Sequence, residues 1–136
     1  MSDLIIFTDG GARGNPGPAG IGIVIYDGEQ KIAGLKKYLG DQLTNNWAEY
    51  QALIIGLADL IARGYQGRRL EVRMDSELIV KQMKGEYKVK HAELKKLNTE
   101  VHALLAHFPH TTFTHIRREK NKEADALVNE AIDTGV

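Results

Sequence analysis

Four carboxylates stand where secondary-structure elements are predicted to begin or end. Asp9 and Asp75 each follow a short apolar run that predicts a strand, whereas Glu49 and Asp125 each fall in about the first turn of a predicted helix. Ligands of open α/β sheets bind at the carboxyl ends of the strands, so we expect both aspartates at one edge of a sheet. If the two helices begin at that edge, four acids converge there.

Such a cluster would bind hard divalent cations, because Mg²⁺ and Mn²⁺ prefer oxygen ligands. Two ions about 4 Å apart can activate a water molecule and stabilise the leaving oxygen of a phosphodiester. Each acid alone has a simpler explanation: Asp9 as a turn residue, Asp75 as an acid before a helix, and Glu49 and Asp125 as charges that favour a helix N-terminus. The metal hypothesis therefore depends on the convergence of all four.

The strands that must position these acids are indicated by apolar and β-branched runs. Residues 4–7 are typical of a strand buried on both faces, and Asp27-Gly28 is a hairpin signal. Residues 10–18 contain so much Gly and Pro that we expect a loop without regular structure. The other predicted strands are residues 21–26, 31–39, 70–74 and 111–117.

Apolar residues at helical spacing predict four helices. The first begins at Thr44 or Asn45, either of which can cap it, and ends at Gly64. The second is capped by Ser76 and ended by Gly85, and the last two cover residues 91–107 and 121–132. The order βββαβααβα predicts an α/β fold with a five-stranded mixed sheet flanked by helices, as a single domain over residues 1–136.

Composition excludes several kinds of site. The 136 residues include no cysteine, which rules out disulfides, thiolate zinc sites and cysteine nucleophiles. Three histidines, His102, His107 and His110, have a spacing that fits no common zinc site. No apolar run is long enough to span a membrane, and residues 1–3 carry no basic region that leads into an apolar stretch. We therefore expect a cytoplasmic protein without a membrane partner.

The charge is balanced overall but unevenly placed. The formal net charge is +0, although six lysines lie between Lys81 and Lys96, and a second basic group occupies residues 117–122. Each group alone is typical of a solvated surface. Composition therefore permits a polyanionic partner without requiring one.

Four motifs together resemble the type 1 ribonucleases H over nearly the whole chain. Residues 8–11 (Thr-Asp-Gly-Gly), with 14–20 behind them, are similar to the opening motif of that family. Residues 44–49 (Thr-Asn-Asn-Trp-Ala-Glu), Asp75-Ser76 and residues 121–125 (Asn-Lys-Glu-Ala-Asp) resemble the second, third and fourth motifs, in the family's order.

The resemblance implies a ribonuclease H-like fold and an RNA–DNA hybrid as the substrate. It implies hydrolysis of the RNA strand with two Mg²⁺ ions, for which Mn²⁺ can substitute, leaving 5′-phosphate and 3′-hydroxyl ends. Asp9, Glu49, Asp75 and Asp125 match the catalytic acids, and Gly10 joins them among the metal-binding residues.

The resemblance also implies contacts with the hybrid. Asn15 and Thr44 match residues that hold a phosphate of the DNA strand, while Asn45 and Asn46 match residues in the minor groove. Short amides and hydroxyls suit these roles, because they can donate to phosphate and to the 2′-hydroxyl. Gly11, like Gly10, would let the RNA backbone approach closely. Helix capping and a tight turn are the structural alternatives.

Three departures from the family pattern stand out. The loop before the last helix is short and has no histidine; Arg118 would take a related part, contact a phosphate from an exposed position, or do neither. Glu77 replaces a common glutamine. The basic protrusion of some members is absent, with only the lysines of residues 84–90 as a modest substitute. We expect a monomer.

Two other functions compete with this interpretation. A non-enzymatic hybrid-binding module would gain nothing from four acids facing phosphates. Among other enzymes on the same architecture, a sugar-kinase-like or actin-like ATPase would need a second, similar domain, for which 136 residues are too short. A transposase is disfavoured because Asn45, Asn46 and Glu49 follow the type 1 pattern and no DNA-end-binding domain is expected in these residues.

Overall fold

The structure, a computed structural model, describes residues 3–136; Met1 and Ser2, on which part of the expectation about a leader rests, lie outside the described residues. The strands are β1 (Leu4–Ala12), β2 (Gly17–Asp27), β3 (Gln30–Leu43), β4 (Leu70–Met74) and β5 (Thr111–His115). The helices are α1 (Asn45–Ala62), α2 (Glu77–Met83), α3 (Ala92–Leu105), the 3₁₀ turn η1 (Arg118–Lys120) and α4 (Lys122–Thr134).

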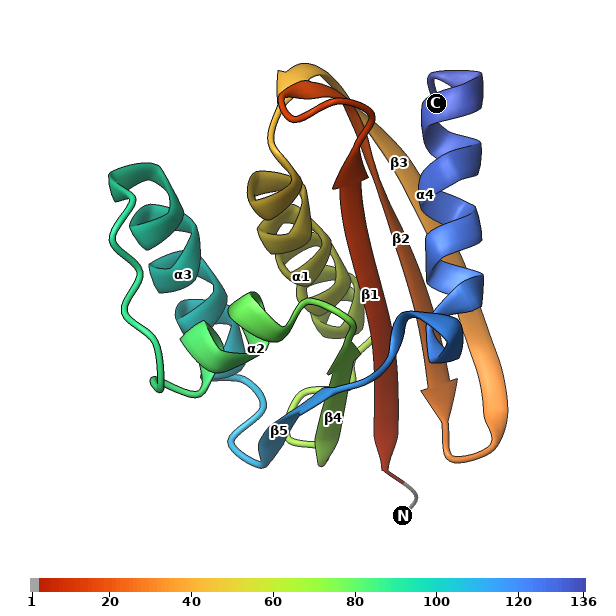
Figure 1. The fold of residues 1–136 in the computed structure, drawn as a ribbon. Helices are drawn as coiled ribbons and strands as arrows, with labels where there is room; N and C mark the ends of the chain where they lie inside the picture. Colours follow the sequence, from red (N-terminus) through yellow and green to blue (C-terminus); the bar gives the residue numbers. More distant parts are fainter. Residues whose placement is uncertain (1–2) are drawn as a thin grey trace.

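The five strands form one mixed sheet in the order β3-β2-β1-β4-β5 (Figure 1). The pairs β1–β2 and β2–β3 are antiparallel, whereas β1–β4 and β4–β5 are parallel. The predicted fold class and element order are therefore confirmed.

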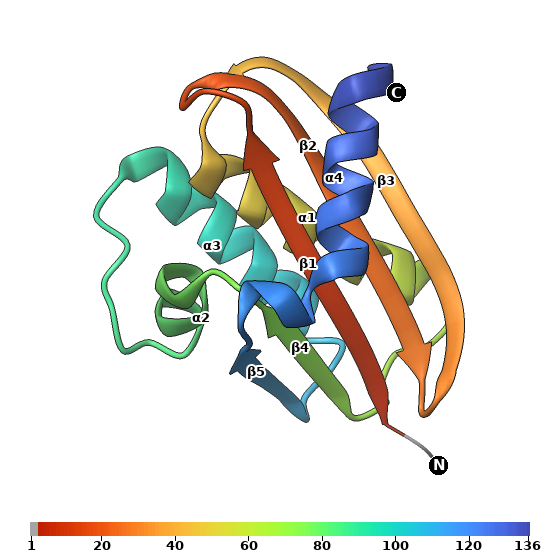
Figure 2. The same cartoon turned by 45° about the vertical axis from the view of Figure 1, so that its right-hand side comes forward.

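Helices cover the two faces of the sheet unequally. α1, α2 and α3 lie on one face, and α4 lies alone on the other, over β2 and β3 (Figure 2). The main core lies beneath α1, where Ile6, Ile23, Leu53, Leu57 and Val72 are almost completely buried. No helix within residues 3–136 combines the length and the apolar character needed to cross a membrane.

The expectation of an irregular loop over residues 10–18 is confirmed for residues 13–16 and wrong at both ends. β1 continues through Gly10 and Gly11 to Ala12, which pairs with Ala19, and β2 already begins at Gly17. Glycine has low intrinsic strand propensity, but here it is selected by close contact, because a side chain at residue 10 would strike the backbone of α1. Tertiary packing therefore overrides the local signal.

Smaller differences concern element ends. β3 extends to Leu43 because its partner β2 begins earlier than predicted, at Gly17, which pairs with Leu43. The last strand ends at His115 instead of residue 117. The short helix η1 was not predicted. Two caps are confirmed: Thr44 accepts a hydrogen bond from the Trp47 N–H, and Ser76 accepts one from Ile79. Glycines with positive φ follow α1 and α2 as predicted.

Replacing Gly22 by Ala should destabilise the protein strongly. α4 packs so closely on β2 that a Cβ at this position would lie 2.0 Å from the Ala124 carbonyl oxygen. We expect a loss of about 3 kcal/mol in the free energy of unfolding, the upper end for an overpacked core, measured by urea denaturation. Gly34→Ala is the matched control: its Cβ would have no neighbour closer than 3.7 Å. Equal stability of the two variants would contradict this account of α4 packing.

Candidate active site

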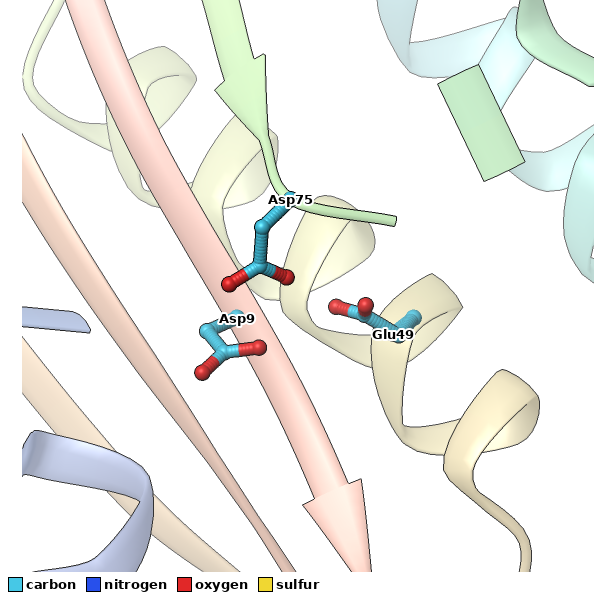
Figure 3. Close-up of side chains that lie close together, drawn as sticks. All are labelled: Asp9, Glu49 and Asp75. Atoms are coloured by element: carbon cyan, nitrogen blue, oxygen red, sulfur yellow. The ribbon is translucent and has the colours of Figure 1, made fainter. Parts of the chain in front are cut away.

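Three carboxylates from different elements meet at the end of the parallel ladder. Asp9 lies on β1, Asp75 follows β4, and Glu49 reaches them from α1 (Figure 3). One oxygen from each of the three lies within 4.8 Å of the others. The parallel register brings the two aspartates together: Thr8 pairs with Met74, and the residues that follow these two are Asp9 and Asp75.

Glu49 reaches this group because α1 lies directly against β1. Its Oε1 accepts a hydrogen bond of 2.9 Å from the Gly10 backbone N–H. A Cβ on Gly10 would be 2.4 Å from the Ala48 carbonyl, so only glycine permits this approach. The glycine of the opening motif thus positions the second acid.

Asp125 joins the site from the opposite face of the sheet. It lies on α4 and lines a cavity of about 420 Å³ with the other three acids, but it is not part of the three-carboxylate group. Its carboxyl nevertheless interacts with Asp9, and it has an ion-pair partner in Arg118 at 3.5 Å. Of the four acids predicted to converge, Asp9, Glu49 and Asp75 therefore form a close group, and Asp125 lies in the same cavity outside it.

Burial and mutual repulsion raise the pKa values of three acids in this site. Burial, reinforced by the charges of Asp75 and Asp125, raises the pKa of Asp9 from 3.8 to about 8. Burial and the neighbouring Asp9 also raise the pKa of Glu49 well above its ordinary value. Burial raises the pKa of Asp75 too, although a hydrogen bond from Asn121 and the charge of Arg118 oppose the rise.

The three clustered acids offer ligand atoms that fit a hard divalent cation. All of them are carboxylate oxygens, which Mg²⁺ and Mn²⁺ prefer. A bound cation would also stabilise the charged form of each acid and thereby remove the cause of the raised pKa values.

Three of the predicted substrate residues, Gly11, Asn45 and Arg118, line the cavity that contains the acids, and Asn15 is hydrogen-bonded to Asn45. The Asn45 backbone N–H donates to Asn15 Oδ1 at 3.0 Å, and Asn45 Oδ1 accepts from the Ala12 N–H at 2.8 Å. A Cβ on Gly11 would lie 3.8 Å from Asn45 Oδ1, so this glycine borders the same cluster. Thr44 and Asn45 are exposed, and Asn46 is half-buried.

Of the departures from the family pattern, Glu77 has partners in the structure, and the lysines are exposed. Glu77, the first residue of α2, pairs with Lys81 at 3.2 Å and lies 3.9 Å from His115. Exposed Lys84, Lys88 and Lys90 follow it at the end of α2 and in the next segment.

Sequence reasoning missed the part that Asn121 takes in the site. It placed this residue at the start of the last helix and at the head of the fourth motif, and gave its side chain no function. The side chain makes no capping hydrogen bond; instead its Nδ2 donates to the Thr8 carbonyl at 3.0 Å. No local signal could have revealed a partner 113 residues away.

Comparison with known proteins agrees with this geometry. The Reverse transcriptase-like family matches residues 7–131. LC11-RNase H1, isolated from compost by a metagenomic approach and solved in complex with an RNA/DNA hybrid, is 51% identical, with a TM-score of 0.93 and coverage of 98% of this chain and 99% of its own. The chain belongs to the type 1 ribonuclease H family. The expected membership is therefore confirmed.

Two further relatives place the chain within this family. The RNase H domain of the bifunctional protein Rv2228c from Mycobacterium tuberculosis is 42% identical, with a TM-score of 0.90 over 98% of this chain and 96% of the relative's chain. Ribonuclease HI of Halobacterium salinarum is 38% identical over 93% of this chain. The chain spans 35% of the full mycobacterial protein and 63% of the Halobacterium protein.

Asp9→Asn should stabilise the metal-free protein at pH 8 and have little effect near pH 4. A carboxyl whose folded pKa is raised favours folding below its unfolded pKa, and this contribution is lost as pH rises through the folded pKa. For Asp9 that window runs from 3.8 to about 8. We expect the variant to have the higher Tm at pH 8 in chelator, measured by circular dichroism.

Exposed Glu100→Gln on α3 is the control and should show no such pH-dependent gain. Mg²⁺ should raise the Tm of the wild type more than that of Asp9→Asn, because it binds the folded acids. An Asp9→Asn protein no more stable than the wild type at pH 8 in chelator would show that the acids do not repel one another.

Proposed function

We propose that this chain is a metal-dependent endonuclease that hydrolyses the RNA strand of RNA–DNA hybrids and leaves 5′-phosphate and 3′-hydroxyl ends. The observation that carries the proposal is the group formed by Asp9, Glu49 and Asp75, with Asp125 in the same cavity. The hybrid bound to LC11-RNase H1, a relative covered over almost its whole chain, supports the substrate.

The four acids would hold two Mg²⁺ ions, with Mn²⁺ as a substitute. Gly10 would contribute its carbonyl oxygen, since its N–H already donates to Glu49. Metal bound there supplies an activated water molecule and stabilises the leaving oxygen of the phosphodiester. The protein's own part is to fix the carboxylates, through the β1–β4 register and the contact between Gly10 and α1.

The linked amides beside the acids would hold the hybrid. The hydrogen bonds within the chain use the oxygens of Asn15 and Asn45, so the NH₂ groups are the donors suited to substrate. Asn15 and Thr44 would bind a phosphate of the DNA strand, and Asn45 and Asn46 the minor groove, where 2′-hydroxyls distinguish RNA from DNA.

Two more residues complete the proposed substrate contacts. Gly11 would allow close approach of the RNA backbone. Arg118 is exposed beside Asp125 and would contact a phosphate.

We also propose that residues 1–136 act as one catalytic domain and as a monomer in the cytoplasm. Light scattering coupled to gel filtration should give a mass near 15.1 kDa.

The purified protein should cut the RNA strand of a labelled hybrid, and neither double-stranded RNA nor double-stranded DNA, only when divalent metal is present. Asp75→Asn should lower kcat by at least about 100-fold, the upper end of what losing a supporting hydrogen bond around a metal costs. Gel analysis of the labelled products, with end-specific enzymes for the termini, checks this. Equal cutting of double-stranded DNA, or activity that survives chelation, would refute the assignment.

Replacing Lys84, Lys88 and Lys90 together by Ala should raise the KM for hybrid and reduce its dependence on salt, with kcat close to the wild-type value. These exposed lysines would neutralise phosphates, and each such contact adds to the slope of log affinity against log salt. Arg69→Ala is the control. Arg69 is an exposed charge just before β4, at the end of that strand opposite to Asp75. An unchanged salt slope in the triple variant would mean that the lysines are only a solvated surface.

A further inference from the structure

Asn121, which joins η1 to α4, is a buried amide beside the acids that the proposed metal and substrate contacts leave without a function. Only 1% of it is exposed. Its Nδ2 donates to the Thr8 carbonyl at 3.0 Å. Because Thr8 immediately precedes Asp9, this bond attaches the start of α4 to the point of β1 that carries the first acid.

Asn121 also interacts with Asp75 and Asp125. An amide NH₂ has two hydrogens; one is bonded to Thr8, and the Asn121 side chain also interacts with the carboxylate of Asp75 and lowers the pKa of that acid. Its backbone carbonyl accepts from the Asp125 N–H at 3.0 Å. One residue thus links the three elements that present Asp9, Asp75 and Asp125.

The rest of the amide argues against a merely structural role. Its Oδ1 is buried and accepts no hydrogen bond from any residue in the range 3–136. An unpaired buried acceptor destabilises a fold, and the side chain does not cap α4. The two donor hydrogens are therefore what the side chain contributes.

We propose that Asn121 is a positioning residue that holds the Thr8 carbonyl and the Asp75 carboxylate so that Asp9 and Asp75 can share one divalent cation. The inference rests on the proposed metal-dependent function. Hydrogen bonds from neighbouring groups orient metal-binding side chains, and their loss typically weakens metal affinity or activity about 10–100-fold.

The test measures metal binding without any nucleic acid. We expect Asn121→Ala to bind Mg²⁺ about 10–100-fold more weakly than the wild type in calorimetric titration. The rise in Tm on adding Mg²⁺ should shrink accordingly. With hybrid, kcat should fall while the KM for hybrid stays near the wild-type value, because the substrate contacts are on other residues.

Asn98→Ala is the matched control. Asn98 also uses its Nδ2 in a partly buried polar contact, with the Tyr50 hydroxyl at 3.2 Å, but it makes no contact with the acids. We expect this variant to lose stability equally with and without Mg²⁺ and to keep the wild-type affinity for the ion. An Asn121→Ala protein that behaves like Asn98→Ala would overturn the proposal.

A measurement on the wild type covers the case in which Asn121→Ala does not fold. In ¹⁵N-labelled protein, both Nδ2 hydrogens of Asn121 should exchange slowly with solvent, and their signals should shift as Mg²⁺ is added. Fast exchange, or signals that Mg²⁺ leaves unchanged, would overturn the inference. Since neither readout involves the hybrid, a protein that cleaves no hybrid but passes these tests would contradict only the proposed function.

Discussion

The close approach of α1 to β1 at Gly10 is the contact on which the geometry of the site depends. With no Cβ in the way, the Gly10 N–H donates to Glu49 and brings that carboxylate beside Asp9. Any side chain at this position would meet the Ala48 backbone at 2.4 Å and push the helix away from the sheet. The chain thus gives up strand propensity at one residue and gains a three-carboxylate group.

That group opposes folding when no cation is present. Two like charges about 5 Å apart at an effective dielectric near 20 repel by on the order of 3 kcal/mol. The raised pKa values of Asp9, Glu49 and Asp75 express this repulsion together with the cost of burial. The extensive apolar core beneath α1 holds the strands in place despite it, and a bound cation would convert the same charges into a source of stability.

Asp125 is held by a different kind of contact. α4 carries mainly small residues towards the sheet and packs against Gly20 and Gly22 of β2. Ion pairs also join α4 to β3, through Lys31–Glu123, and to the segment after β1, through Arg13–Asp133, but they are exposed, and exposed pairs contribute little. Close backbone packing therefore sets the position of Asp125, which lies in the same cavity as the other acids but outside their tight group.

The sequence by itself determined the element order, the caps at Thr44 and Ser76, and the strand end that Asp75 follows, because periodicity and capping are local properties. The resemblance to ribonucleases H added the expected function. Only the tertiary structure showed that β1 runs on through Gly10 and that Asn121 binds the Thr8 carbonyl. Glycines carry no hydrophobic period, and an amide gives no sign of a partner 113 residues away, so both features depend on contacts that exist only after the chain has folded.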